Sequence, residues 1–113
     1  MKRILVVDDD ARIVERLVTL LSDRHVAVAA SNGFDALKHL DADTFDVMLL
    51  DVRMPGLDAP GLIDALKSRQ HQVPIILMSA NPNLPERARQ LGITRYLVKP
   101  FEVEQLEALI DRI

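Results

Sequence analysis

Five short runs of mainly apolar residues recur along the chain with no alternation of polar positions inside them. They cover residues 4–7, 26–30, 47–50, 74–78 and 96–98. Runs of this length are too short for helices and are typical of strands that are buried on both faces of a parallel sheet. Each run ends at a polar or turn-forming residue, so the pattern predicts five separate strands.

The segments between the strands carry apolar residues at the spacing of an amphipathic helix. Asp10 and Asp58 are predicted N-caps of the first and third helices, because an aspartate side chain can accept from the free N–H groups of a first turn. The predicted inward positions of the first three helices are Ile13, Val14, Leu17, Leu20 and Leu21, then Phe34, Leu37 and Leu40, then Leu62, Ile63 and Leu66.

The fourth helix is predicted to be short because Pro82 and Pro85 interrupt the segment before it. We expect it roughly over residues 86–91, with Gly92 just beyond its C-terminal cap. The last helix follows Phe101, whose ring can pack onto Leu106 as a hydrophobic staple.

Strands that alternate with helices predict an α/β fold, with a parallel sheet covered by helices on both faces. The carboxyl ends of parallel strands share one edge of the sheet, and ligands bind there, where the strand order reverses. The residues that follow the predicted strands are Asp8 and Asp9, Ser31, Asp51, Ser79 and Lys99. Reactive polar side chains are therefore expected to gather at this edge, although Ser31 in a Ser-Asn-Gly turn is read as structural.

Composition narrows the choice of function. The 113 residues fit one domain, predicted over 1–113, and the net charge of −3 argues against direct nucleic-acid binding. The chain has no cysteine, which excludes disulfides and thiolate sites. Neither a signal peptide nor a membrane span is evident at the start, so we expect a cytoplasmic protein without a membrane partner. His25, His39 and His71 have no metal-ligand spacing and are expected to be surface positions or to have no role.

Three carboxylates that converge at one edge would repel one another unless a cation lies among them. Oxygen ligands and the absence of cysteine favour Mg²⁺, which in proteins usually acts on phosphate groups. One carboxylate, Asp51, then becomes a candidate nucleophile that forms an aspartyl phosphate. Lys99 can neutralise phosphoryl oxygens, and the Ser79 hydroxyl can donate a hydrogen bond to one of them.

Four segments lie in a characteristic order and spacing: Ile4-Leu5-Val6-Val7-Asp8-Asp9-Asp10, Asp51-Val52-Arg53-Met54-Pro55-Gly56, Ser79-Ala80 and Tyr96-Leu97-Val98-Lys99-Pro100-Phe101. In this respect the sequence resembles the receiver domain of bacterial two-component response regulators over essentially its whole length. The resemblance implies a CheY-like, flavodoxin-like (βα)5 fold: a doubly wound parallel sheet of five strands in the order 2-1-3-4-5.

The resemblance also implies a phosphoacceptor role for Asp51, which would take a phosphoryl group from the phosphohistidine of a sensor histidine kinase or a phosphotransfer protein. Mg²⁺ would be held by Asp8, Asp9 and Asp51 together with the main-chain carbonyl of Arg53. A domain of this kind is a signalling module and catalyses at most its own phosphorylation and dephosphorylation.

The remaining implied residues surround the phosphoryl group. Lys99 would pair with it, and the Lys99-Pro100 peptide bond would be cis. Ser79 would move to bind it, with Tyr96 turning inward behind. From the sequence alone, Tyr96 is expected to be a core aromatic with a solvated hydroxyl, and only the resemblance makes it a switch residue.

The resemblance further implies an output surface formed by the fourth helix, fifth strand and fifth helix. A homodimer through that face and an effector domain C-terminal to Ile113 are the corresponding partners. Two departures from the family pattern fall near this region. Ala59 replaces a common glycine, and the span from Ser79 to Lys99 is shorter than usual, which predicts a fourth helix shortened at its N-terminus.

Two other functions are compatible with parts of the pattern. A receiver-like scaffold could bind partners without phosphorylation. A haloacid-dehalogenase-like phosphohydrolase would use the Asp-x-Asp of residues 8–10, but it would need an acidic pair after Lys99 that is not evident, and it would leave Asp51 without a role.

Overall fold

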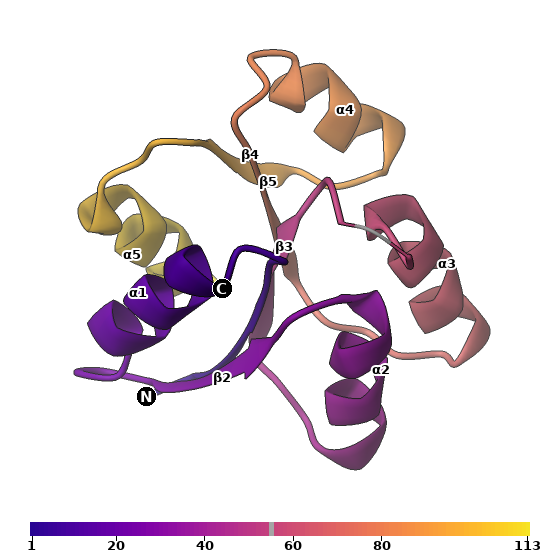
Figure 1. The fold of residues 1–113 in the computed structure, drawn as a ribbon, viewed down its shortest axis with the longest axis horizontal. Coiled ribbons are helices and arrows are strands. Elements are labelled where there is room, and N and C mark those ends of the chain that lie inside the picture. The colour runs from indigo at the N-terminus through magenta and orange to yellow at the C-terminus, as the bar shows by residue number, and fades with distance from the viewer. Residues whose placement is uncertain (55) are drawn as a thin grey trace.

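Strands and helices alternate along the whole chain in the computed structural model, which describes residues 1–54 and 56–113 (Figure 1). The elements are β1 (Arg3–Val7), α1 (Ala11–Leu21), β2 (Val26–Ala30), α2 (Gly33–Ala42), β3 (Val47–Asp51), α3 (Ala59–Ser68), β4 (Ile75–Ser79), α4 (Leu84–Gln90), β5 (Arg95–Val98) and α5 (Val103–Asp111). All five predicted strands are present, each within a residue of its expected ends.

The strands form one parallel sheet in the order β2-β1-β3-β4-β5, as the sequence resemblance implied. The order reverses between β1 and β3, which lie next to each other. Val7 pairs with Leu50, so the residues that follow them, Asp8 and Asp51, emerge side by side. This pairing positions the site described below.

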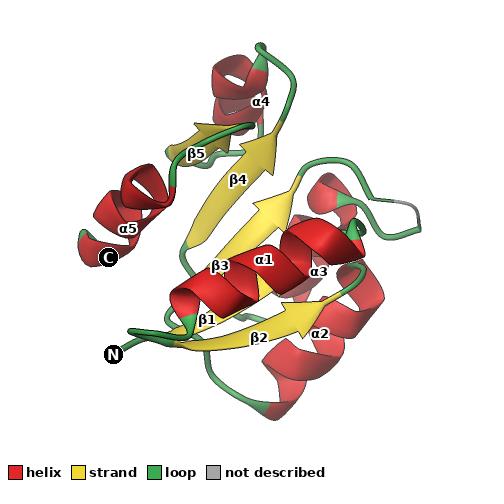
Figure 2. Cartoon of the chain, turned by 60° about the vertical axis from the view of Figure 1, so that its left-hand side comes forward, coloured by secondary structure: helices red, strands yellow, loops and turns green. Residues whose placement is uncertain are grey.

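Helices cover both faces of the sheet (Figure 2). α1 and α5 pack on one face, while α2, α3 and α4 pack on the other. Successive residues of β1 serve the two faces in turn: Ile4 and Val6 belong to the α1/α5 core, and Leu5 and Val7 to the other. Burial on both sides explains why the central strands have no polar alternation.

Side chains cap the helices largely where the sequence predicts. Asp10 Oδ1 accepts from the N–H of Arg12 at 3.0 Å, and Asp58 Oδ1 accepts from the N–H of Gly61 at 3.0 Å. Both predicted N-caps are therefore confirmed. Pro55, in the segment Asp51-Val52-Arg53-Met54-Pro55-Gly56, lies outside the described residues. Gly56 has a φ of 77°, a left-handed conformation that suits glycine.

The predicted start of α4 is wrong. The helix begins at Leu84, two residues before the expected position, and ends at Gln90. Pro85 does not delay the helix because it occupies the first turn, where the missing N–H would have no partner within the helix. Gly92 follows the C-cap with a φ of 74°, as predicted.

Two residues expected inside are exposed. Phe34 is 58% exposed because it lies in the first turn of α2, beside Gly56 of the β3–α3 loop and not over the sheet. Leu20 is 41% exposed. It lies at the rim of the apolar stripe of α1, in a groove that it shares with Phe101.

The C-terminal half of α5 is fastened to the amino-terminal edge of the sheet. Lys2 Nζ donates to the carbonyl of Ile110 at 2.6 Å, and the N–H of Lys2 donates to Nδ1 of His25 at 3.2 Å. His25 Nε2 lies 3.3 Å from Glu107 on α5. The expectation that His25 is a surface residue is therefore wrong, because its ring is buried and contacts both Lys2 and Glu107. Across the described residues, no helix is long and apolar enough to cross a membrane.

Candidate functional site

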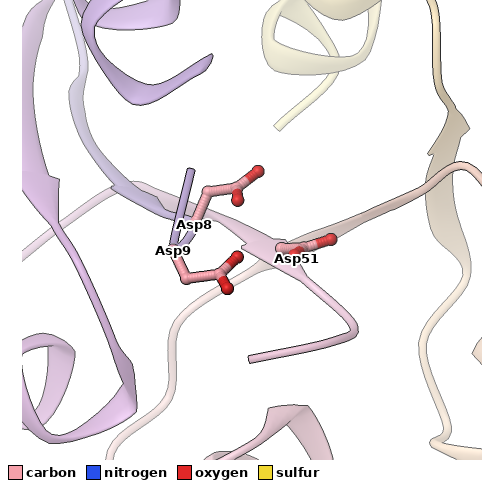
Figure 3. Close-up of side chains that lie close together, drawn as sticks. All are labelled: Asp8, Asp9 and Asp51. Carbon is pink, nitrogen blue, oxygen red and sulfur yellow. The ribbon is translucent and has the colours of Figure 1, made fainter. Parts of the chain in front are cut away.

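Three carboxylates converge at the carboxyl edge of the sheet (Figure 3). Asp8 and Asp9 follow β1, and Asp51 is the last residue of β3. One carboxylate oxygen from each lies within 4.8 Å of the others. Asp8 and Asp51 are buried, whereas Asp9 is exposed. This spacing allows the three side chains to share one cation.

The chemistry of this cluster fits a hard divalent cation. Carboxylates are the protein ligands that Mg²⁺ prefers, and the cluster opens into a cavity of about 660 Å³ that leaves room for water ligands. Arg53 lies in the wall of the same cavity, two residues after Asp51. The structure thus places all four residues of the expected metal site around one space.

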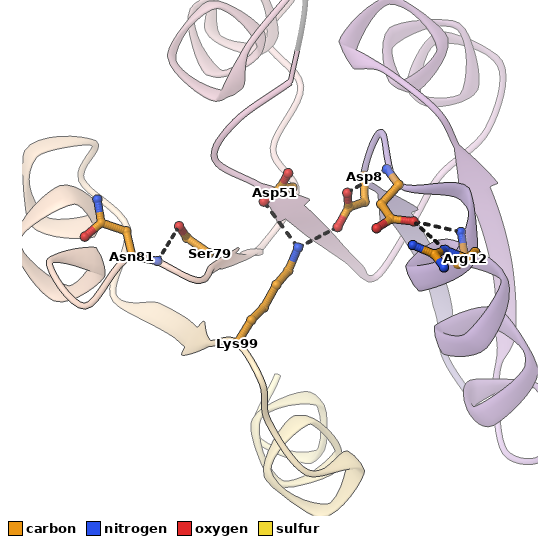
Figure 4. A network of polar contacts seen from close by, with 7 residues as sticks. Asp8, Arg12, Asp51, Ser79, Asn81 and Lys99 are labelled. Carbon is orange, nitrogen blue, oxygen red and sulfur yellow. Dashed lines mark hydrogen bonds and ion pairs between the residues drawn. The ribbon is translucent and has the colours of Figure 1, made fainter.

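Lys99 reaches into the cluster from the loop after β5 (Figure 4). Its Nζ donates to Asp8 Oδ2 at 2.8 Å and lies 3.4 Å from Asp51 Oδ1. Asp8 Oδ1 accepts from the N–H of Asp10 at 3.0 Å, so both oxygens of this buried carboxylate are engaged. The peptide bond between Lys99 and Pro100 is cis.

Burial is the main cause of an unusual pKa at Asp51. Removal from water raises the pKa of this carboxyl most, Lys99 opposes that rise, and the charges of Asp8 and Asp9 add to it. Together these effects raise the pKa of Asp51 from 3.8 to about 6. For Lys99, burial acts to lower the pKa, but the hydrogen bond to Asp8 and the charges of Asp51 and Asp8 outweigh it and raise the pKa above 10.5. The cluster therefore carries excess negative charge that a cation would relieve.

Ser79 lies in the wall of the same cavity, at the end of β4. Its Oγ accepts a hydrogen bond from the main-chain N–H of Asn81 at 3.1 Å. The hydroxyl points toward Asn81 and not toward Asp51 (Figure 4). Asn81 was not singled out from the sequence, because a serine oxygen that accepts from the N–H two residues later forms a local turn that does not require an asparagine side chain.

Two other residues considered from the sequence lie outside the cavity wall. Tyr96 projects from β5 with 38% of its surface exposed. Ser31 follows β2, which is an edge strand, and its N–H donates to Asp35 Oδ2 at 3.3 Å. The site is therefore built from the ends of β1, β3, β4 and β5.

The sheet is doubly wound, and a cavity lined by carboxylates and Lys99 lies where the strand order reverses. This arrangement defines a flavodoxin-like α/β domain. Within that class, the chain belongs to the family described as the response regulator receiver domain, whose model matches residues 4–111. It is therefore a receiver domain of the two-component response regulator type.

Named relatives agree with this assignment. The chain is 37% identical over 110 residues to the DNA-binding transcriptional regulator NtrC of Escherichia coli (strain K12), covering 95% of this chain and 24% of NtrC. Chemotaxis protein CheY4 of Vibrio cholerae matches with a TM-score of 0.88 and 28% identity, covering 100% of this chain and 98% of CheY4.

Response regulator protein TrrA of Thermotoga maritima, described in complex with Mg²⁺-BeF, matches with a TM-score of 0.85 and 30% identity. That match covers 99% of this chain and 98% of TrrA. The chain spans only about a quarter of the length of NtrC.

Proposed function

We propose that residues 1–113 form a phosphorylation-controlled receiver domain whose phosphoacceptor is Asp51. The observation that carries this proposal is a convergence of side chains from three distant parts of the sequence around one cavity: Asp8 and Asp9, Asp51, and Lys99. Both oxygens of Asp8 already accept hydrogen bonds, one from Lys99 and one from the N–H of Asp10. Asp51, the last residue of β3, also lines the cavity and is therefore the preferred acceptor.

In the proposed reaction, a carboxylate oxygen of Asp51 attacks the phosphorus of a phosphohistidine on a sensor kinase or phosphotransfer protein. The new O–P bond forms as the P–N bond breaks, and the imidazole leaves with the electron pair. Asp8, Asp9, Asp51 and the carbonyl of Arg53 would hold Mg²⁺, which when bound supplies positive charge to the phosphoryl oxygens.

Lys99 supplies the second positive charge. In the present structure its Nζ lies between Asp8 and Asp51, so a small movement would bring it to a phosphoryl oxygen on Asp51. The Ser79 hydroxyl would donate to another oxygen after turning from its present partner, and Tyr96 would turn inward behind it. Phosphorylation would then bias the region around β4 and β5 toward a second conformation.

Partners follow from the family. Response regulators interact with histidine kinases, and their receiver domains are attached to effector domains, as in NtrC. We propose the face formed by α4, β5 and α5 as the output surface, used for an effector domain C-terminal to Ile113 or for a homodimer. We also propose that the domain is a signalling module that catalyses at most its own phosphorylation and dephosphorylation. The cytoplasmic location stays a prediction.

Labelling with a small phosphodonor tests the proposal. Incubation with acetyl phosphate and Mg²⁺ should add one phosphoryl group to the intact protein, as measured by mass spectrometry. Asp51→Asn should abolish the label, whereas Asp64→Asn, which removes an exposed acid on α3, should keep it. A label that survives Asp51→Asn at the wild-type level would contradict the assignment of the nucleophile.

A receiver-like scaffold that ignores phosphorylation is the second candidate. The observation that favours it is the short α4 of seven residues, which lies in the proposed output surface. Beryllofluoride, the phosphoryl mimic present in the TrrA complex, distinguishes the two functions. If Mg²⁺ and beryllofluoride left the amide spectrum from Ser79 to Tyr96 unchanged, the scaffold function would be preferred.

A further inference from the structure

An apolar groove lies between α3 and α4, on the face of the sheet opposite α1 and α5 (Figure 1). It lies toward the amino-terminal edge of the sheet, because its walls are the end of α3 and the loops that lead into β4 and β5. Its volume is about 640 Å³, within the range of sites that bind small molecules. The aliphatic residues that line it are Ile63, Leu66, Val73, Ile75, Leu91 and Ile93.

The sheet is incompletely covered at this groove. β4 is an interior strand whose last four residues are buried, but its first residue, Ile75, is only half-buried. Val73, Leu91 and Ile93 are also half-buried, although they pack against the core beneath α2, α3 and α4. Apolar surface that stays in contact with water inside a concave site favours a ligand that removes it from water.

Hydrogen bonds hold both walls of the groove in place. On one side, the N–H of His71 donates to the carbonyl of Leu66 at 2.9 Å, and His71 Nε2 lies 2.8 Å from Asp41 Oδ1. On the other side, the N–H of Ile93 donates to the carbonyl of Ala88 at 2.9 Å. The groove is therefore preformed, and a ligand would not have to order either loop when it binds.

The charge around the groove is positive. Among the described residues that line it, Lys67, His71 and Arg95 are ionisable and none is acidic. Neither Lys67 nor Arg95 forms an ion pair with an acid in the described part of the chain. Residues 65–101 contain six Lys or Arg and one acid, Glu86, in a chain whose net charge is −3. The groove is therefore complementary to an apolar molecule that carries a negative charge.

We propose that this groove binds a small amphiphilic carboxylate, a molecule with one hydrocarbon chain and one acidic head group. The hydrocarbon chain replaces water against Ile75, Leu91 and Ile93, and the carboxylate pairs with the exposed ammonium of Lys67 at the end of α3. The site lies away from the carboxyl edge at which Asp51 ends β3, so it does not depend on the proposed function.

Amide NMR of the whole chain with decanoate, kept below its micelle concentration, tests the site. The amides of residues 71–75 and 91–95 should shift and saturate, while those of Asp9 and Asp51 stay in place. Hexanoate should bind several-fold more weakly, because its shorter chain covers less apolar surface. Decyltrimethylammonium has a hydrocarbon chain of the same length and the opposite charge, and it should also bind several-fold more weakly.

Two pairs of variants test the role of charge. Lys67→Glu should weaken decanoate binding by about fivefold or more, whereas Lys38→Glu makes the same charge change on the exposed face of α2 and should leave the affinity unchanged. Thr94→Glu places a negative charge at an exposed position of the lining and should weaken binding in the same way. Thr94→Gln, of similar size and without charge, should retain it. Unchanged amides in α1 verify the fold of each variant.

Two kinds of result would overturn the proposal. The location would be wrong if decanoate caused no saturable shift, or shifted only amides elsewhere, such as those of the groove that Leu20 and Phe101 share. The ligand class would be wrong if decyltrimethylammonium bound as tightly as decanoate, or if both Lys67→Glu and Thr94→Glu bound decanoate with the wild-type affinity.

Discussion

Asp51→Asn should stabilise the metal-free protein. The ionised carboxylate is buried beside Asp8 and Asp9, and an amide of nearly the same shape removes its charge while keeping an oxygen that can accept from Lys99. The free energy of unfolding rises because residue 51 no longer carries a buried charge that Asp8 and Asp9 repel. The weaker attraction to Lys99 offsets part of this rise. The variant that removes the proposed phosphoacceptor is therefore expected to be the more stable protein.

The pKa of Asp51 sets the size of the effect. Its rise from 3.8 to about 6 corresponds to an upper limit of about 3 kcal/mol, at roughly 1.4 kcal/mol per pKa unit. The carboxylate faces an open cavity in which water screens part of the penalty, so we expect about 1–2 kcal/mol near neutral pH. For a domain of this size, such a gain raises the melting temperature by roughly 4–8 °C.

The pH dependence follows from the direction of the shift. Because the folded protein holds the Asp51 proton more tightly than the unfolded chain, wild-type stability falls as the pH rises from 3.8 to about 6. Above that window the penalty is complete, and below it both states are protonated and the penalty disappears. The advantage of Asp51→Asn should therefore be full near neutral pH and absent below about pH 4.

Urea unfolding in EDTA, followed by circular dichroism, measures this difference. Asp64→Asn is the matched control, since it makes the same charge change at an exposed position of α3 and should stay within about 0.5 kcal/mol of the wild type. An Asp51→Asn variant no more stable than the wild type near neutral pH would refute the reasoning, as would an advantage that persists below the titration window.

Three further predictions concern the cation, the lysine and the histidine. Mg²⁺ at ten times its dissociation constant should stabilise the wild type by about 1.4 kcal/mol in thermal melts, and Asp9→Asn should lose most of that gain; no effect on the wild type would mean that the carboxylates share no ion. Lys99→Met should destabilise the metal-free protein by roughly 2–4 kcal/mol in urea, because Asp8 would remain buried without its cation; a cost below about 1 kcal/mol would contradict this. His25→Ala should cost about 1–3 kcal/mol and speed hydrogen exchange in the C-terminal half of α5, which His25 contacts through Glu107. Unchanged exchange there would show that the contact does not hold the helix.

The strands could be predicted from the sequence because burial on both faces leaves an unmistakable apolar run, as in residues 47–50. The strand order could not be derived from that pattern and came from the family resemblance. Where the prediction of α4 failed, the reason is local: Pro85 breaks a helix interior but is tolerated in a first turn, and the sequence alone did not indicate which position it occupied.

Side-chain surroundings were predicted less well than the elements. Phe34 and Leu20 have apolar side chains at helical spacing, yet one lies beyond the sheet and the other at the rim of the stripe. The acidic and basic members of the site could be anticipated because strand ends of a parallel sheet share one edge. The hydrogen bond from the main-chain N–H of Asn81 to Ser79 could not be anticipated, since it depends on the path of the main chain after β4.

Lys2 and His25 hold the C-terminal half of α5 at the amino-terminal edge of the sheet. The chain passes Lys2 at the amino-terminal edge of the sheet, and α5 returns to that edge at Ile110, whereas Asp51 opens at the opposite edge. A segment joined after Ile113 would leave from the far end of the molecule. A phosphoryl donor could therefore contact the edge at Asp51 while a domain attached after α5 stays at the opposite edge. Neither would have to dissociate before the other binds.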